Sequence, residues 1–186
     1  MNIIIRTYKG NIVTRPDTSW KSRDESFFAP GFVKSVSVSP VMFLRICKAG
    51  KCVPTKFASR YYDAIGYGFL LYAENIITES EEGFSSASCL DHTTFIPDLN
   101  LDKQFIAGPS SEFELIAGND IHLGVKGLST DEIAVLVEQA TSRCLVRTAD
   151  IIAVELSHRE CLPQNGRIEI KTLLDSKLYQ NIEVVF

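Results

Sequence analysis

The hydrophobic pattern between residues 36 and 75 predicts two long strands at the centre of the fold. Apolar residues alternate at the start of this stretch and become nearly continuous over residues 41–47, which is typical of a strand buried on both faces. A turn follows at Gly50, residues 55–63 read as a short helix, and a second apolar strand begins at Ile65. The rest of the chain is expected to be arranged around these elements.

Shorter runs of apolar and β-branched residues on either side of this stretch predict further strands. They cover residues 3–5, 12–13, 95–101, 112–118, 121–127, 150–156, 167–175 and 177–186. Gly118, Asn119 and Asp120 separate two of these runs, as in a β-hairpin. The chain is therefore expected to be rich in β-structure.

Two polar stretches, residues 14–26 and 77–93, are interpreted as loops. The first is a candidate mobile loop, in which Trp20 is expected to pack against the core rather than serve as a stacking platform. The second contains several acidic and serine residues and is expected to be exposed. Pro30 and Gly31, between aromatic residues, predict a tight turn beside the core.

The clearest helix lies in the stretch from Leu128 to Val146, and either Ser129 or Thr130 can cap its start. Asp131 and Glu132 lie in the first turn and Arg143 near the end, as the helix dipole favours. Apolar residues at helical spacing form one stripe, namely Ile133, Leu136, Val137 and Ala140. The whole pattern predicts a single β-rich α+β domain over residues 1–186, with two or three short helices at its periphery.

The composition excludes several classes of partner. The net charge is -4, and Lys and Arg are scattered along the sequence, so nucleic acid is not expected as a partner. No apolar run approaches the roughly 20 residues of a membrane span, and the first residues lack the features of a signal peptide. The five cysteines, an odd number, fit reduced thiols. We therefore expect a cytoplasmic protein without a membrane partner.

Two short clusters carry residues capable of chemistry. His158, Glu160 and Cys161 follow the strand predicted at residues 150–156, and a cysteine near a histidine could supply a nucleophile and a base. The simpler interpretation is an ordinary polar loop, because this spacing defines no geometry. Asp91 and His92 could likewise form an acid-base pair, but the favoured interpretation is that Asp91 caps a turn and His92 is solvated.

Several segments are similar to the sequence motifs of one protein family and follow one another in the same order. They are MNIIIRTYKGN (1–11), ICKAGKCV (46–53), DAIGYG (63–68), CLDHTTFIPD (89–98), the helix and strand at 128–156, and the ending at 162–186. Together they resemble the C-terminal domain of the fumarylacetoacetate hydrolase superfamily, including its I-G-K-x-G-K strand end and G-Y-T strand. The resemblance implies mixed β-sheets rolled into a barrel-like core with helices outside, usually in a homodimer.

The resemblance also implies a chemistry. Enzymes of that family act on 2-oxo or 1,3-dicarbonyl acids with a divalent cation, held by a Glu-x-Glu pair on one strand and an Asp on the next. A hard cation prefers such carboxylate oxygens, and it polarises the oxo group of the substrate.

These carboxylates are missing from this chain. Aligning ICKAGK with the family's strand end places the pair at Ser39 and Val41, and aligning YAEN with its T-A-R-D motif places the Asp at Leu70. No Asp or Glu lies anywhere between Phe27 and Tyr62, so a shifted alignment does not restore the site. We therefore expect no metal cofactor.

Three further positions depart from the family. Its Lys falls at Ser88, its G-T-P substrate loop falls near residues 155–157, and its N-terminal His has no counterpart in residues 6–25. The sequence thus favours a catalytically degenerate relative that binds a small organic acid or acts as a scaffold.

Two alternatives remain: an active hydrolase, isomerase or decarboxylase of oxo acids with a relocated or metal-free site, and a structural partner subunit. Asp91 and His158 are expected to flank any remaining pocket. The candidate substrate-binding residues are Asp91, His92, His158 and Glu160.

Overall fold

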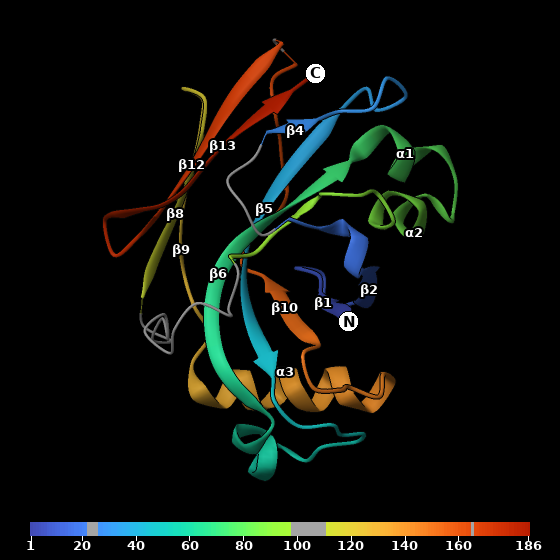
Figure 1. The fold of residues 1–186 in the computed structure, drawn as a ribbon, viewed down its shortest axis with the longest axis vertical. Helices are drawn as coiled ribbons and strands as arrows, with labels where there is room; N and C mark the ends of the chain where they lie inside the picture. Colours follow the sequence, from blue (N-terminus) through green and yellow to red (C-terminus); the bar gives the residue numbers. More distant parts are fainter. Residues whose placement is uncertain (22–25, 98–110, 165) are drawn as a thin grey trace.

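The larger of two β-sheets forms the centre of the molecule. The computed structural model describes residues 1–21, 26–97, 111–164 and 166–186. The larger sheet has the strand order β2-β1-β10-β5-β6-β7-β3, and β11 also pairs with β5. Its strands are β1 (Asn2–Arg6), β2 (Ile12–Pro16), β3 (Trp20–Lys21), β5 (Val36–Ile46), β6 (Tyr62–Ala73), β7 (Thr94–Phe95), β10 (Ile151–Glu155) and β11 (Glu160–Cys161). Figure 1 shows this sheet curling beside the second one.

The second sheet has the order β4-β13-β12-β8-β9. Its strands are β4 (Phe27–Phe28), β8 (Glu112–Ala117), β9 (Ile121–Lys126), β12 (Arg167–Leu174) and β13 (Lys177–Val185). The predicted hairpin between β8 and β9 is confirmed, with Ala117 opposite Ile121. The α+β class and the barrel-like curl of mixed sheets are likewise confirmed (Figure 1).

The two central strands, β5 and β6, pair antiparallel from Val36 opposite Ala73 to Ile46 opposite Tyr62. Almost all of their residues are buried, which confirms burial on both faces. A Cβ atom at Gly68 would collide with the backbone carbonyl of Phe95. The short strand β7 can therefore lie against β6 because residue 68 has no side chain.

Helix α3 (Thr130–Arg143) crosses the lower end of the sheets (Figure 1). Its start forms a capping box: the Ser129 hydroxyl accepts a hydrogen bond from the Glu132 backbone N–H at 3.3 Å, and the Glu132 carboxylate accepts one from the Ser129 N–H at 2.8 Å. All four residues of the predicted apolar stripe are buried. The prediction of this helix is confirmed.

The prediction of an exposed loop over residues 77–93 was wrong. The loop predicted at 77–93 contains most of α1 (Glu74–Glu79) and all of α2 (Gly83–Ser88). Their apolar residues Ile77 and Phe84 pack against a core cluster, and a Cβ at Gly83 would strike α1, so tertiary contacts rather than local pattern hold the pair together.

The short helix predicted at 55–63 is the 3-10 helix η2 (Thr55–Arg60), which ends earlier, and β6 begins at Tyr62 rather than Ile65.

The predicted loop at 14–26 is only partly irregular. It contains the end of β2, the 3-10 helix η1 (Asp17–Ser19) and β3, while residues 22–25 lie outside the described residues, as do residues 98–101 of the strand predicted at 95–101. Trp20 packs against the core and donates from Nε1 to the Ile96 carbonyl at 2.7 Å, which confirms its predicted packing role.

The core has two parts. The first contains residues from both sheets and α3, and the second contains residues from β1, β5, β6 and β10 on the opposite face of the larger sheet. Within the described residues, no helix is long and apolar enough to cross a membrane.

Candidate functional site

The three positions expected to carry metal ligands lie together on one face of the larger sheet. Ser39 on β5 lies opposite Leu70 on β6, and Val41 follows two residues later on the same face. All three side chains are buried. The Ser39 hydroxyl donates to the Ser157 carbonyl oxygen at 3.3 Å. The fold therefore assembles this site, but with one hydroxyl and two aliphatic side chains.

A buried carboxylate and a phenol lie on the same face. Glu155 on β10 is directly opposite Val41, and Tyr72 follows Leu70 by two residues. The Tyr72 hydroxyl donates to Glu155 Oε1 at 2.5 Å, and the Tyr8 backbone N–H donates to Oε2 at 2.7 Å. Burial raises the pKa of Tyr72 well above its usual value. Each carboxylate oxygen thus has a donor.

Arg15 is a cation buried beside this pair, with only 1% of its surface exposed. Its guanidinium donates to the Leu71 carbonyl oxygen at 2.9 Å, to both oxygens of Thr93 at 3.0 and 3.1 Å, and to the Thr94 hydroxyl at 3.3 Å. It also lies 4.2 Å from the centroid of the Tyr72 ring. Burial lowers the pKa of Arg15 below its usual value. The backbone carbonyls of the sheet compensate its charge.

A second guanidinium approaches the same ring. Arg159 lies 4.8 Å from the Tyr72 centroid, and its Nε is 3.3 Å from Glu74 Oε1. The Ser37 hydroxyl donates to the same oxygen of Glu74 at 2.5 Å. Two guanidinium and two carboxylate groups thus make up the Tyr72 network, so its formal charges cancel. They belong to Arg15, Arg159, Glu74 and Glu155.

This arrangement does not fit a divalent cation. A hard cation requires several oxygen ligands, whereas Val41 and Leu70 supply none and Ser39 already donates to a carbonyl. The neighbouring Glu155 carboxylate is already engaged, because each of its oxygens accepts a hydrogen bond. Across the described part of the chain, no group of three or more His, Cys, Asp and Glu side chains is arranged to hold a metal ion.

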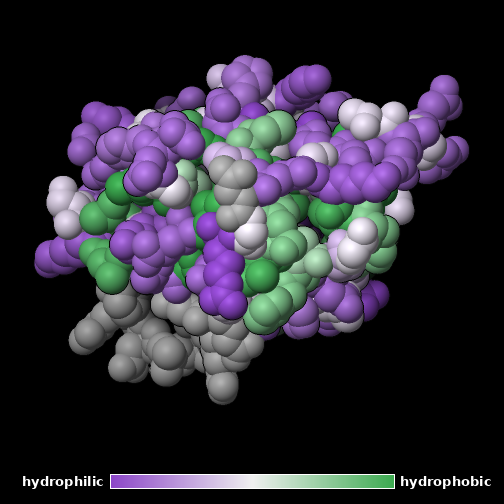
Figure 2. Space-filling model, turned by 90° about the horizontal axis from the view of Figure 1, so that it is seen from above, coloured by the Kyte–Doolittle hydropathy of each residue, from purple (hydrophilic) through white to green (hydrophobic). Residues whose placement is uncertain are grey.

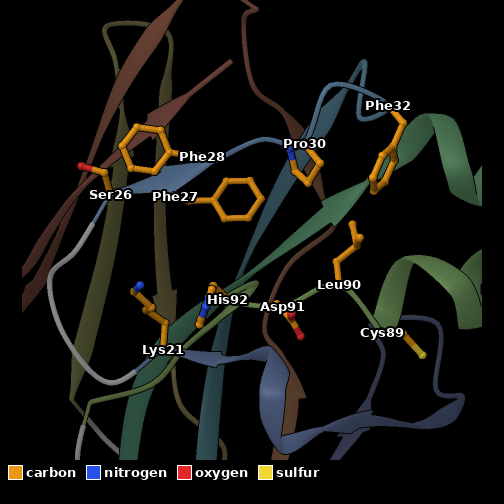
Figure 3. A pocket seen from close by; sticks show the side chains of 10 residues that line it. All are labelled: Lys21, Ser26, Phe27, Phe28, Pro30, Phe32, Cys89, Leu90, Asp91 and His92. Atoms are coloured by element: carbon orange, nitrogen blue, oxygen red, sulfur yellow. The ribbon is translucent and has the colours of Figure 1, made fainter.

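An open pocket of about 820 Å³ lies elsewhere, between β4 and the segment after α2. Its lining residues are Lys21, Ser26, Phe27, Phe28, Pro30, Phe32, Cys89, Leu90, Asp91 and His92. Figure 3 shows Phe27 and Phe28 across the pocket from Lys21 and His92. Phe28 and Phe32 are exposed, and the view from above in Figure 2 shows hydrophobic side chains among hydrophilic ones at this end. The pocket thus combines an apolar wall with polar groups.

Two of the four candidate residues, Asp91 and His92, line this pocket. His92 has φ +57°, a left-handed conformation that is uncommon for residues other than glycine, and its backbone N–H donates to the Thr18 carbonyl at 3.2 Å. Strained backbone of this kind is often found at binding sites. The role of both residues in ligand binding is a prediction.

The other two candidates lie outside that lining. The His158 ring packs against the Tyr8 ring with centroids 4.1 Å apart. Glu160 is on β11, opposite Val38 of β5, rather than on a loop as predicted. Asp91 and His158 therefore do not share this pocket.

The Tyr72 network was not predicted from the sequence. Arg15 lay in a predicted loop, and Glu155 lay near the end of the strand predicted at 150–156, where it was read only as a departure from the family's G-T-P loop. One signal was present, because a carboxylate that ends the buried run of β10 needs a partner. Nothing local identified Tyr72 or Arg15 as that partner.

The two sheets and their helices define an α+β protein, and its sequence and structure can be compared with those of known proteins. No protein-family model matches the sequence, and no curated protein sequence matches it. Solved structures do match. A Yersinia pestis CO92 protein assigned to the fumarylacetoacetate hydrolase family superimposes with a TM-score of 0.78 and 14% identity, covering 99% of this chain and 92% of the other.

Two further structures are enzymes. The fumarylpyruvate hydrolase of Pseudomonas aeruginosa, solved with Mn²⁺ and pyruvate, gives a TM-score of 0.77 at 10% identity, covering 100% of this chain and 88% of that one. The 5-carboxymethyl-2-hydroxymuconate delta-isomerase of Mycobacterium smegmatis gives a TM-score of 0.76 at 14% identity, covering 99% of this chain and 78% of that one. This chain therefore has the fold of the fumarylacetoacetate hydrolase family, as its motifs suggested.

Proposed function

We propose that this chain is a catalytically degenerate protein of the fumarylacetoacetate hydrolase fold, which binds a small organic acid or acts as a scaffold. The observation that carries the proposal is the composition of the central face. Ser39, Val41 and Leu70 stand where the family's carboxylates are expected, and the Tyr72 network lies on the same face.

The remaining polar groups on that face are poorly suited to replace a cation. A guanidinium is always protonated, so Arg15 and Arg159 can accept no proton and ligate no metal. Burial raises the pKa of Tyr72, which keeps its hydroxyl protonated at neutral pH, so no phenolate is present to accept a proton or to bind a cation. Both oxygens of Glu155 already accept hydrogen bonds. These features support a structural role for the network.

The pocket beside β4 supports the binding of a small organic acid. Phe27 and Leu90 can bury the apolar part of such a ligand, while His92 can donate a hydrogen bond to its carboxylate. Asp91 can accept a hydrogen bond from a ligand hydroxyl. The homodimer implied by the resemblance is part of the proposal and is tested by analytical ultracentrifugation.

Metal analysis and thermal shift test the proposal together. After dialysis, the protein is expected to hold no stoichiometric Mg²⁺, Mn²⁺ or Ca²⁺, and these ions are expected to leave the melting temperature unchanged. A small oxo or aromatic acid that binds the native state is expected to raise it. About one such ion per chain would contradict the proposal, as would cation-dependent turnover of a 2-oxo acid.

Three histidine variants locate the binding site. His92→Ala is expected to abolish the shift caused by the acid. His122→Ala is the matched control, since His122 is exposed and pairs with Glu114 at 2.8 Å. If His158→Ala alone abolishes the shift, the ligand binds beside Tyr8 instead.

The alternative is a metal-free hydrolase, isomerase or decarboxylase of oxo acids. One observation favours it: a carboxylate, a phenol and two guanidinium groups meet on the face where the family's ligands are expected. Turnover of 2-oxo or 1,3-dicarbonyl acids in the presence of a chelator, lost in Glu155→Gln, would establish this alternative.

A further inference from the structure

One end of the molecule concentrates basic residues. The segment at 47–62 carries four Lys and Arg residues and the segment at 143–149 carries two, while neither contains an acid, although the whole chain has a net charge of -4. The six residues are Lys48, Lys51, Lys56, Arg60, Arg143 and Arg147, and all are exposed. In Figure 1 these segments form the lower end of the molecule, at and below α3. We call this surface the basic end.

Backbone pairing joins the two segments. Gly50 and Val146 exchange two hydrogen bonds, at 3.0 and 2.9 Å. Lys51 Nζ donates to the Arg143 carbonyl oxygen at 2.7 Å, across a sequence separation of 92 residues. The helix η2 packs against α3. The six cations therefore share one continuous surface.

The cations are not neutralised by acids. Within the described residues, none of the six forms an ion pair with an acid. The neighbouring carboxylate of Asp63 pairs with Arg45 instead, at 2.7 Å. Their charges are therefore available to an external anion.

Exposed apolar side chains lie among these cations. Phe57 is 37% exposed and Leu145 is 51% exposed. The cationic groups of Lys56 and Arg60 lie 4.9 and 5.0 Å from the Phe57 ring centroid. The basic end therefore offers both positive charge and small apolar projections.

We propose that the basic end docks on a membrane surface that contains anionic phospholipids. Its cations match the phosphate and carboxylate groups of such lipids, which attract basic side chains close to the surface. Phe57 and Leu145 can enter the region between headgroups and acyl chains while the cations stay among the headgroups. This proposal is independent of the proposed function.

The same features disfavour single-stranded nucleic acid. A binding site for bases needs open aromatic faces for stacking. The Phe57 ring is flanked by the cationic groups of Lys56 and Arg60, and Lys48 Nζ lies 5.2 Å from the Tyr61 ring centroid. The sequence analysis expected no membrane partner because the chain has no apolar run long enough for a span. Docking of a basic surface requires no such span.

Vesicle cosedimentation tests the proposal. The full chain is expected to sediment with vesicles of equal parts phosphatidylcholine and phosphatidylserine but not with pure phosphatidylcholine. Raising NaCl from about 0.1 M to about 1 M, which shortens the Debye length from about 10 Å to about 3 Å, is expected to release it. Phe57→Ala is expected to weaken binding at low salt, because apolar area leaves the interface.

Matched triple variants separate local from overall charge. The variant Lys48→Gln/Lys56→Gln/Arg60→Gln is expected to lower the partition coefficient on the order of a hundredfold, from three lost attractions. The control Lys9→Gln/Lys34→Gln/Lys177→Gln removes the same charge from exposed positions outside the basic end and is expected to retain binding.

Equal losses in both triple variants would overturn the proposal, as would equal binding to both kinds of vesicle. A parallel arm measures fluorescence anisotropy of a labelled single-stranded RNA. Binding to RNA that depends on Lys48, Lys56 and Arg60, without binding to anionic vesicles, would assign the surface to nucleic acid instead.

Discussion

The hydroxyl of Tyr72 on β6 donates a 2.5 Å hydrogen bond to Oε1 of Glu155 on β10, although β5 separates the two strands. Residues that face the same side of a sheet two strands apart can meet when long side chains extend toward each other above the strand between them. On β5, Ser37 lies opposite Tyr72 and Val41 lies opposite Glu155, so Ser39 is the residue between these two positions on the same face. The short side chains of β5 at these positions are compatible with a bond that passes over the strand.

Tyr72→Phe is expected to lower the free energy of unfolding by about 1–3 kcal/mol, because it leaves a buried carboxylate oxygen of Glu155 without its donor. Urea unfolding monitored by circular dichroism measures the loss. Tyr62→Phe is the control, since within the described residues the Tyr62 hydroxyl has no hydrogen-bond partner, and a change within about 0.5 kcal/mol is expected there. Equal losses in the two variants would contradict the role assigned to the Tyr72–Glu155 bond.

Arg15→Met is expected to lower the free energy of unfolding by about 3–5 kcal/mol. The substitution removes a buried cation from a charge-balanced network and leaves the carbonyl oxygens of Leu71 and Thr93 without this donor. The comparison is Arg167→Met. Arg167 is 71% exposed and its Nη1 lies 3.5 Å from Glu183, so a change of about 0–1 kcal/mol is expected. Denaturant unfolding of both variants decides the matter. A stable Arg15→Met protein would show that the network is not required for folding.

Alkaline pH is expected to destabilise the fold through two tyrosines, Tyr67 on β6 and Tyr179 on β13. Burial raises the pKa of Tyr67 and of Tyr179 to about 12, against about 10 in an unfolded chain. Between these values the native state keeps protons that the unfolded state has lost. The stabilisation is therefore complete below about pH 10 and is lost as pH rises through about 12.

Unfolding free energies measured across this window are expected to fall as the pH rises, while tyrosinate absorbance of the native protein lags that of the denatured protein. The decline is expected to be shallower in Tyr67→Phe and shallower still when Tyr179→Phe is added. A slope unaffected by both substitutions would exclude these residues as its source.

Local pattern was sufficient for the longest elements. The continuous apolar run of β5 predicted its burial on both faces, and a cap at Ser129 or Thr130 followed by two acids predicted the start of α3. Both depend on residues close in sequence, so periodicity and capping chemistry reveal them. The helices α1 and α2 escaped prediction because they are six residues each and depend on packing against the sheet.

The sequence by itself determined that no Asp or Glu occurs between Phe27 and Tyr62, and hence that the central strand β5 carries no carboxylate. Only the tertiary structure decided which side chains meet. Strand register brings Glu155 to Tyr72, and the pairing of Gly50 with Val146 gathers the cations of the basic end. Strand register and loop pairing join residues that are far apart in the chain, so the local sequence pattern does not predict them.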